Sequence, residues 1–176
     1  MIIKSNDAEM AAVLAAANQM CAAARTAPKT CGVDKVLTKI LTGDDIEKIA
    51  VKMEEIGAAV NRPFFARNAE SIRSGLAIVL IGIKRHYYAL NCGYCGHENC
   101  AACKEAGTLC LFAPTDLGIA MGSAVAMAAD MRIDNRIMYS IGRAIEVMPE
   151  YNDGEDAIWM GIPLSVTGKS PFFDRK

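Results

Sequence analysis

The residues with the most evident chemistry are five cysteines within one 19-residue segment, CGYCGHENCAACKEAGTLC. They are separated in turn by two, four, two and six residues, and they are Cys92, Cys95, Cys100, Cys103 and Cys110. Iron-sulfur clusters are held by cysteine thiolates, and a short C-x2-C turn directs two sulfur atoms at one metal centre. Gly93 and Gly96 allow the unusual backbone angles that such turns need. The segment therefore predicts a bound metal, with an iron-sulfur cluster favoured.

The spacing also suggests which thiols bind. A 4Fe-4S cluster needs four ligands, and we expect them to be Cys92, Cys95, Cys100 and Cys110, with a short helix over residues 101–107 between the last two. Cys103, on the same helix, could replace Cys110 or stay free, and the sequence leaves this open. Structural zinc is the alternative, although the pairs are closer together than the roughly 15 to 20 residues usual in zinc ribbons.

The composition of the chain bounds its surroundings. Seven cysteines occur in 176 residues whose start has no basic and apolar leader, so we expect a cytoplasmic protein with reduced thiols. A formal net charge of −1 gives no basic excess for a nucleic-acid backbone. The most apolar runs, residues 76–83 and 117–129, are shorter than the roughly 18 to 20 residues that span a bilayer. We therefore expect neither a nucleic-acid nor a membrane partner.

The elements that must position the cysteines follow from apolar periodicity. Helical spacing predicts helices over residues 7–24, 44–60, 64–74 and 116–131, the last with Thr115 as its N-cap. The continuous apolar run predicts a strand at 76–83 that is covered on both faces, and further strands are expected at 136–145 and 156–164. Residues 33–41 are left open as a strand or a short helix. This order predicts a single α+β domain over residues 1–176, with helices packed on a small mixed sheet and a cysteine-rich metal-binding insertion at residues 91–112.

Other positions allow more than one interpretation. The small residues at 118–128 fit tight helix packing, a partner subunit or a cofactor surface. His86, Tyr87 and Tyr88 follow the apolar strand and could line a site, but no carboxylate or nucleophile is evidently paired with the histidine. Cys31 is either a small buried residue or a reactive thiol.

Two stretches outside the central strand carry a resemblance to a known family. The cysteine segment followed by DLGIAMGSAVAMAAD, and the ending MGIPLSVTGKSPFFDR, resemble a family of uncharacterised prokaryotic proteins that contain a ferredoxin domain. The resemblance covers most of the chain. That family has no established reaction, so the resemblance indicates relatives more than it indicates a function.

A second resemblance is to the flavin-dependent nitroreductase-like fold. It rests on AARTAPKTCG at residues 23–32, on the apolar helix DLGIAMGSAVAMAAD, and on the ending WMGIPLSVTGKSPFFDR. In such proteins a basic residue near the first helix and another near the C-terminus hold the FMN phosphate across a homodimer interface. The resemblance implies Arg25 and Lys169 in these roles, with Lys29 and Arg175 in reserve, because an Arg fork and a mobile Lys are suited to a phosphate.

Two functions from different classes fit these features. The first is an iron-sulfur redox protein of nitroreductase-like type, in which electrons pass between the cluster and FMN and a small redox partner exchanges them. The second is a non-enzymatic binding or scaffold protein, in which zinc or a structural cluster only stabilises the insertion and no flavin binds. Fold alone does not decide between them.

Overall fold

The computed structural model describes residues 1–173 of the chain. Its helices are α1 (Ser5–Thr26), α2 (Asp44–Ala59), α3 (Phe64–Arg73), α4 (Cys100–Glu105), α5 (Phe112–Asp130), α6 (Tyr139–Glu146) and α7 (Pro149–Asn152), with a 3-10 turn at Thr30–Gly32. Its strands are β1 (Val36–Thr42), β2 (Ala77–Lys84), β3 (Asp134–Asn135) and β4 (Ala157–Ser165). The segment that the sequence left open therefore contains a strand.

The strands form one sheet in the order β1-β2-β4-β3. β2 is central, with Ile81 opposite Thr38 of β1 on one side and opposite Met160 of β4 on the other. The expected α+β class is confirmed, but the sheet is not mixed, because every pairing among the described strands is antiparallel. A single crossover helix between two strands would favour a parallel pair. Here two helices, α2 and α3, lie between β1 and β2, and the chain returns so that the start of β2 pairs with the end of β1. The two strands are therefore antiparallel.

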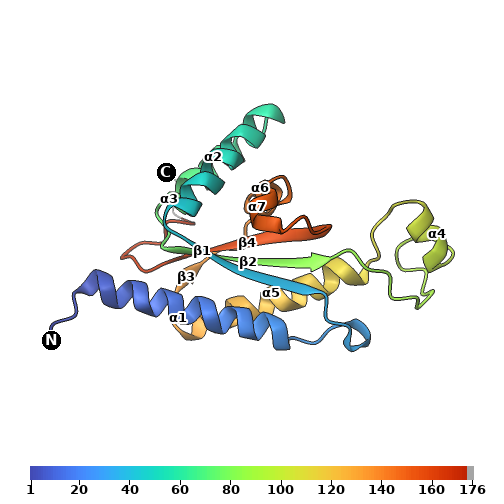
Figure 1. The fold of residues 1–176 in the computed structure, drawn as a ribbon, viewed down its shortest axis with the longest axis horizontal. Coiled ribbons are helices and arrows are strands. Elements are labelled where there is room, and N and C mark those ends of the chain that lie inside the picture. Colours follow the sequence, from blue (N-terminus) through green and yellow to red (C-terminus); the bar gives the residue numbers. More distant parts are fainter. Residues whose placement is uncertain (174–176) are drawn as a thin grey trace.

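Helices cover both faces of the sheet (Figure 1). α1 and α5 pack side by side on one face, and α2, α3, α6 and α7 lie on the other. The side chains of β2 alternate between two cores, since Val79 and Ile81 pack towards α1 and α5, whereas Ile78 and Leu80 pack towards α2 and α6. Burial on both faces explains the uninterrupted apolar run, and the prediction of a covered central strand is confirmed.

Helix α6 corrects one expectation, because residues 136–145 do not form a strand. Ile141 and Ile145 are fully buried and lie four residues apart, which is helical spacing. Gly142 lets this helix approach β4, since a Cβ atom at that position would lie 1.7 Å from the carbonyl oxygen of Trp159. The apolar residues read from the sequence as one face of a strand are therefore the buried stripe of a helix.

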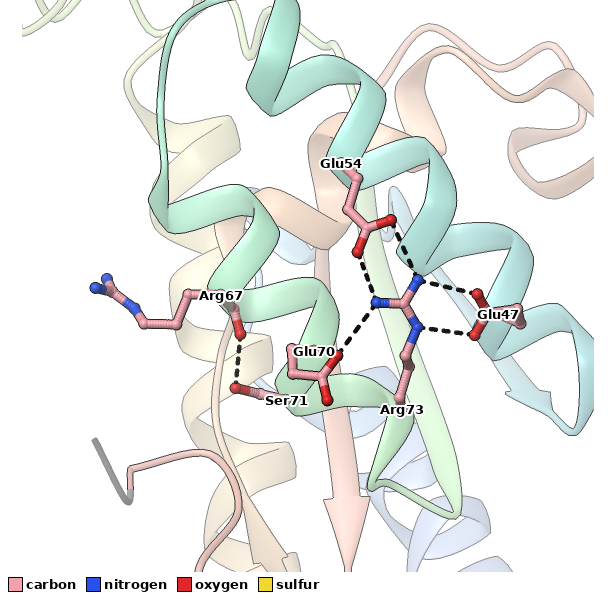
Figure 2. A network of polar contacts seen from close by, with 6 residues as sticks. All are labelled: Glu47, Glu54, Arg67, Glu70, Ser71 and Arg73. Atoms are coloured by element: carbon pink, nitrogen blue, oxygen red, sulfur yellow. Dashed lines mark hydrogen bonds and ion pairs between the residues drawn. The ribbon is translucent and has the colours of Figure 1, made fainter. Parts of the chain in front are cut away.

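A charge network joins α2 to α3 on the side of the sheet away from α1 (Figure 2). Arg73 donates two hydrogen bonds of 2.9 Å to Glu47 and two, of 2.6 and 3.2 Å, to Glu54, and lies 3.5 Å from Glu70. These bonds raise the pKa of Arg73, with Glu54 the larger cause, and they lower the pKa values of Glu47 and Glu54. The network stabilises the helix pair and contacts none of the cysteines.

Helix α5 is the most apolar helix of the fold. By length and composition it could cross a membrane, and 39% of its most apolar 18-residue stretch is buried within the protein. Its inner face packs against α1 through Ala120, Ala124 and Ala128, which are fully buried. Its outer face exposes Gly118 and Gly122, where an added Cβ would meet no atom within 4 Å. Part of an apolar helix thus remains uncovered by the rest of the chain.

Candidate metal and flavin sites

The cysteine segment leaves the sheet after β2 and returns to it at α5, and α4 lies at one end of the molecule, apart from the other helices (Figure 1). Asn91 has a left-handed backbone, with φ 47°. Its N–H donates to Cys100 Sγ at 3.3 Å, and its side-chain oxygen accepts the Cys100 N–H at 2.9 Å. The Asn99 side chain caps α4. Cys100 therefore begins the short helix, as the sequence predicted.

Three of the five thiols influence one another electrostatically. Cys103 interacts with both Cys95 and Cys110. Cys103 is 1% exposed, and its sulfur lies 3.4 Å from the Thr108 hydroxyl. The Thr108 hydrogen bond favours the Cys103 thiolate, but burial and the two neighbouring sulfurs outweigh it and raise the pKa of Cys103. The backbone N–H of His97 lowers the pKa of Cys95.

The donor chemistry fits a thiolate-bound metal, whereas the geometry is only partly formed. Across residues 1–173, no three Cys, His, Asp or Glu side chains converge closely enough to hold one metal ion. Cys92 is exposed, and the Cys100 sulfur accepts a hydrogen bond from the backbone of Asn91. Four-thiolate coordination thus requires the loop over residues 91–99, which carries Cys92 and Cys95, to rearrange so that four sulfurs converge on one metal.

Cys103 is more closely connected to the other thiols than the spacing suggested. The spacing gave preference to Cys110 and left Cys103 as a substitute, yet Cys103 interacts with both Cys95 and Cys110. One signal was available: Cys103 follows Cys100 by three residues on a helix, so the two side chains leave neighbouring positions of its surface. The preferred set of four ligands stays a prediction.

The cations expected near the first helix already have local partners. Arg25 donates to Asp34 Oδ2 at 2.7 Å and to the Val36 carbonyl at 2.6 Å. Its guanidinium and the nearby charge of Lys29 contribute to lowering the pKa of Asp34 despite the opposing effect of partial burial. Lys29 Nζ donates to the carbonyls of Ala24, Arg25 and Ala27, so it caps the C-terminus of α1. A phosphate would have to share or displace these contacts.

One chain does not bring Arg25 and Lys169 together. Thr167, two residues before Lys169, lines a cavity of about 500 Å³ together with Asp7 at the start of α1. Arg25 lies 18 residues further along α1, about 27 Å away at roughly 1.5 Å of rise per residue. The two expected phosphate contacts thus lie towards opposite ends of one helix. Arg175, the reserve candidate, lies outside the described residues.

A buried carboxylate connects the turn Thr30–Gly32 with the root of the cysteine segment. Asp116, 1% exposed, accepts hydrogen bonds from the Thr30 N–H at 3.0 Å, the Thr30 hydroxyl at 2.8 Å and the Tyr88 hydroxyl at 2.6 Å. Burial and the Asp116 carboxylate raise the pKa of Tyr88. The expected N-cap at Thr115 is wrong, because α5 begins at Phe112 and the Thr115 hydroxyl bonds back to Leu111 within the helix.

The arrangement of helices on this antiparallel sheet matches solved nitroreductase structures. A nitroreductase with bound FMN from Bacteroides fragilis aligns with a TM-score of 0.63 at 10% identity, covering 100% of this chain and 84% of that one. The hypothetical oxidoreductase YcnD from Bacillus subtilis aligns with a TM-score of 0.57 at 12% identity, and covers 89% of this chain. The chain spans 58% of the length of that oxidoreductase. The protein therefore has the nitroreductase fold.

Sequence comparison identifies the family within that fold. The profile of uncharacterized proteins containing a ferredoxin domain (DUF2148) matches residues 106–175. An uncharacterized protein from Archaeoglobus fulgidus is 42% identical over 184 residues, covering 99% of this chain and 98% of the relative. The chain belongs to this ferredoxin-domain family. Both resemblances that the sequence suggested are confirmed.

Proposed function

We propose that this protein is a cytoplasmic iron-sulfur oxidoreductase in which the cysteine segment binds a 4Fe-4S cluster and the nitroreductase body binds FMN. The observation that carries the proposal is the segment of five closely spaced thiols, in which Cys103 interacts with both Cys95 and Cys110. That segment belongs to a ferredoxin-domain protein whose fold is also that of a nitroreductase with bound FMN. When bound, a cluster supplies one-electron steps and a flavin joins them to two-electron chemistry.

The chain's own residues would hold the cluster by thiolate ligation. Cys103 already interacts with Cys95 and with Cys110, so these three thiols are the first candidates. Cys92 and Cys100 complete the choice of ligands, and movement of the loop at residues 91–99 would release Cys100 from the Asn91 N–H. Backbone N–H groups of such a loop also donate to cluster sulfur atoms and so adjust the reduction potential.

The flavin proposal requires a homodimer. Arg25 and Lys169 lie towards opposite ends of α1, so a phosphate between them takes one cation from each of two chains. The outer faces of α1 and α5 suit close packing with a second copy, since they expose small side chains and few charges: Ala8, Ala11, Ala12 and Ala15 on α1, and Gly118, Gly122 and Ala126 on α5. Small residues let helix backbones approach, and burying them leaves no charge unpaired.

A second candidate function is a scaffold protein stabilised by zinc. It is favoured by His97, whose Nε2 lies 2.8 Å from the Thr108 hydroxyl, which in turn contacts Cys103. Only the Thr108 side chain therefore connects this imidazole nitrogen to the Cys103 thiol, and zinc accepts mixed sulfur and nitrogen ligands. In this case the metal would only order the insertion.

The test is metal, sulfide and flavin analysis of protein purified without oxygen, with a visible spectrum. About four irons and four sulfides per chain, with a flavin absorbance band, are expected. One zinc per chain in a colourless solution would support the scaffold instead. Cys95→Ser should abolish binding of either metal, whereas Cys21→Ser, which alters a half-buried thiol on α1, is the matched control and should leave the metal content unchanged.

The remaining partner is a small redox protein that exchanges electrons with the cluster. The segment projects from the sheet, and Leu90, Tyr94, Leu109 and Leu111 around it are exposed. Electron-transfer complexes are small and short-lived, and an apolar surface beside the cofactor suits them. Reduction of the bound cluster by a reduced ferredoxin, measured from the visible spectrum, would test this part of the proposal.

A further inference from the structure

Asp116 is unusual because it is a carboxylate in the first half of the apolar helix α5 with 1% of its surface exposed. Burying a carboxylate is costly unless hydrogen bonds replace its hydration. Its hydrogen-bond partners in residues 1–173 are the Thr30 N–H, the Thr30 hydroxyl and the Tyr88 hydroxyl, and none of them is a cation. Helix packing alone would be better served by an apolar residue here, so the carboxylate is there to hold these donors.

The donors belong to two segments that are far apart in the sequence. Thr30 is 86 residues from Asp116 and begins the turn Thr30–Gly32, in which Cys31 has a left-handed backbone with φ 54°. Tyr88 is 28 residues from Asp116 and lies on the stretch that leads from β2 into the cysteine segment. A non-glycine residue with positive φ is held there by its surroundings, and two bonds from Thr30 to Asp116 supply that constraint.

Aromatic contacts extend the connection into the cysteine segment itself. The Tyr88 ring packs edge-on against Phe112 with 6.3 Å between centroids, and Phe112 lies 6.2 Å from the ring of Tyr94. Tyr94 stands between Cys92 and Cys95. Although 71% of Tyr94 is exposed, its ring contacts Phe112, so rearrangement of the loop around a bound metal would reach the Asp116 carboxylate through Phe112 and Tyr88.

The geometry points to Asp116 as a positioning residue that couples the cysteine segment to the turn bearing Cys31. Metal binding by the cysteines fixes Tyr94 and, through Tyr88, the bond to Asp116, which then holds Thr30 and the exposed Cys31 in one conformation. The metal-dependent half of this inference rests on the proposed function. The connection between Tyr88 and Thr30 through Asp116 does not depend on it.

The first experiment uses the full chain without added metal and follows amide hydrogen exchange by mass spectrometry. Tyr88→Phe removes one donor to Asp116 and keeps the ring. Exchange should become faster both at residues 86–92 and at residues 29–33, which are distant in sequence. Ser123→Ala is the matched control, since it also removes a hydrogen bond made by an α5 side chain, the one from Ser123 to the Ala23 carbonyl. Faster exchange limited to residues 86–92 would overturn the proposed coupling.

The second experiment compares the alkylation rate of Cys31 by iodoacetamide, quantified on its peptide, before and after reconstitution with iron and sulfide or with Zn²⁺. In the wild type, bound metal should slow the alkylation of Cys31 by about threefold or more. In Tyr88→Phe the ratio of the rate without metal to the rate with metal should return towards one, while the metal content is unchanged. Asp116→Asn, which keeps the shape, should behave in the same way. An equal rate with and without bound metal, or an undiminished ratio in both variants, contradicts the inference. If no metal binds, the proposed function fails, and the exchange experiment still decides the coupling.

Discussion

Replacing Gly122 with Glu should have opposite effects on the folding of one chain and on the association of two. Gly122 lies in the exposed face of α5, and a Cβ there meets no atom within 4 Å, so the chain itself can accept the side chain. Removing a glycine from a helix interior should raise the free energy of unfolding by about 0.5 to 1 kcal/mol. In the proposed dimer the same glutamate would be buried without a partner, at a cost of roughly 3 kcal/mol or more. That corresponds to a dissociation constant raised by about 100-fold or more.

Three measurements separate these effects. Sedimentation velocity reports the dimer, urea unfolding at low protein concentration reports the stability of the chain, and flavin absorbance after gel filtration reports FMN per chain. The Gly122→Glu protein should be monomeric, at least as stable as the wild-type monomer, and free of flavin. Ala58→Glu places the same charge on the exposed end of α2, on the opposite face of the sheet, and should alter neither association nor flavin content.

The result that refutes this reasoning is specific. A Gly122→Glu dimer as tight as the wild type would remove α5 from the interface. A Gly122→Glu monomer that still binds FMN with wild-type affinity would show that Arg25 and Lys169 need not come from two chains. A loss of stability would mean that α5 has contacts that the single chain does not contain.

Three further changes test other parts of the structure. Cys103→Ser should lower the metal content as strongly as Cys95→Ser, because the two thiols interact, and retention of full metal content would return Cys103 to the role of a spare thiol. Gly142→Ala should lower the free energy of unfolding by about 3 kcal/mol or more, measured in urea, since its Cβ would lie 1.7 Å from the carbonyl oxygen of Trp159; a loss below 1 kcal/mol would disprove that approach. Arg73→Met should cost about 1 kcal/mol at neutral pH. The glutamates that Arg73 contacts on α2 have lowered pKa values, so they stabilise the fold above their unfolded pKa. The difference in unfolding free energy between Arg73→Met and the wild type should therefore shrink as the pH falls through their folded pKa values. A difference that stays constant in acid would contradict this origin.

The parts of the fold that sequence periodicity predicted are those in which one local pattern is sufficient. Strand β2 is buried on both faces, so an apolar run of strand length identifies it, and α2 has helical spacing with acidic residues in its first turn. The misassigned element, α6, is short, and its isoleucines at 141 and 145 fit a period of two as well as a period of four. Only the contact of Gly142 with β4 distinguishes the two, and that contact is tertiary.

The candidate site likewise has a part that local sequence predicts and a part that depends on tertiary contacts. Five thiols at short spacing indicate metal ligation from the sequence alone, but the interaction of Cys95 with Cys103 depends on the fold of the turn between Gly96 and Asn99. Asp116 could not be found from its neighbours, because it reads as an ordinary residue near a helix start. Its role depends on Thr30, which the fold brings from 86 residues away.

The position of the cysteine segment gives the two proposed cofactors a common support. The segment ends where α5 begins, and α5 carries both the buried Asp116 and the exposed glycines of the proposed dimer interface. The turn held by Asp116 begins directly after Lys29, which caps the helix bearing Arg25. In the proposed coupling, a change in the metal segment would therefore reach the expected phosphate contacts through one buried carboxylate rather than through the whole sheet. For this reason the loss of Asp116 should impair metal-dependent behaviour before it impairs the two cores, whose apolar residues do not include it.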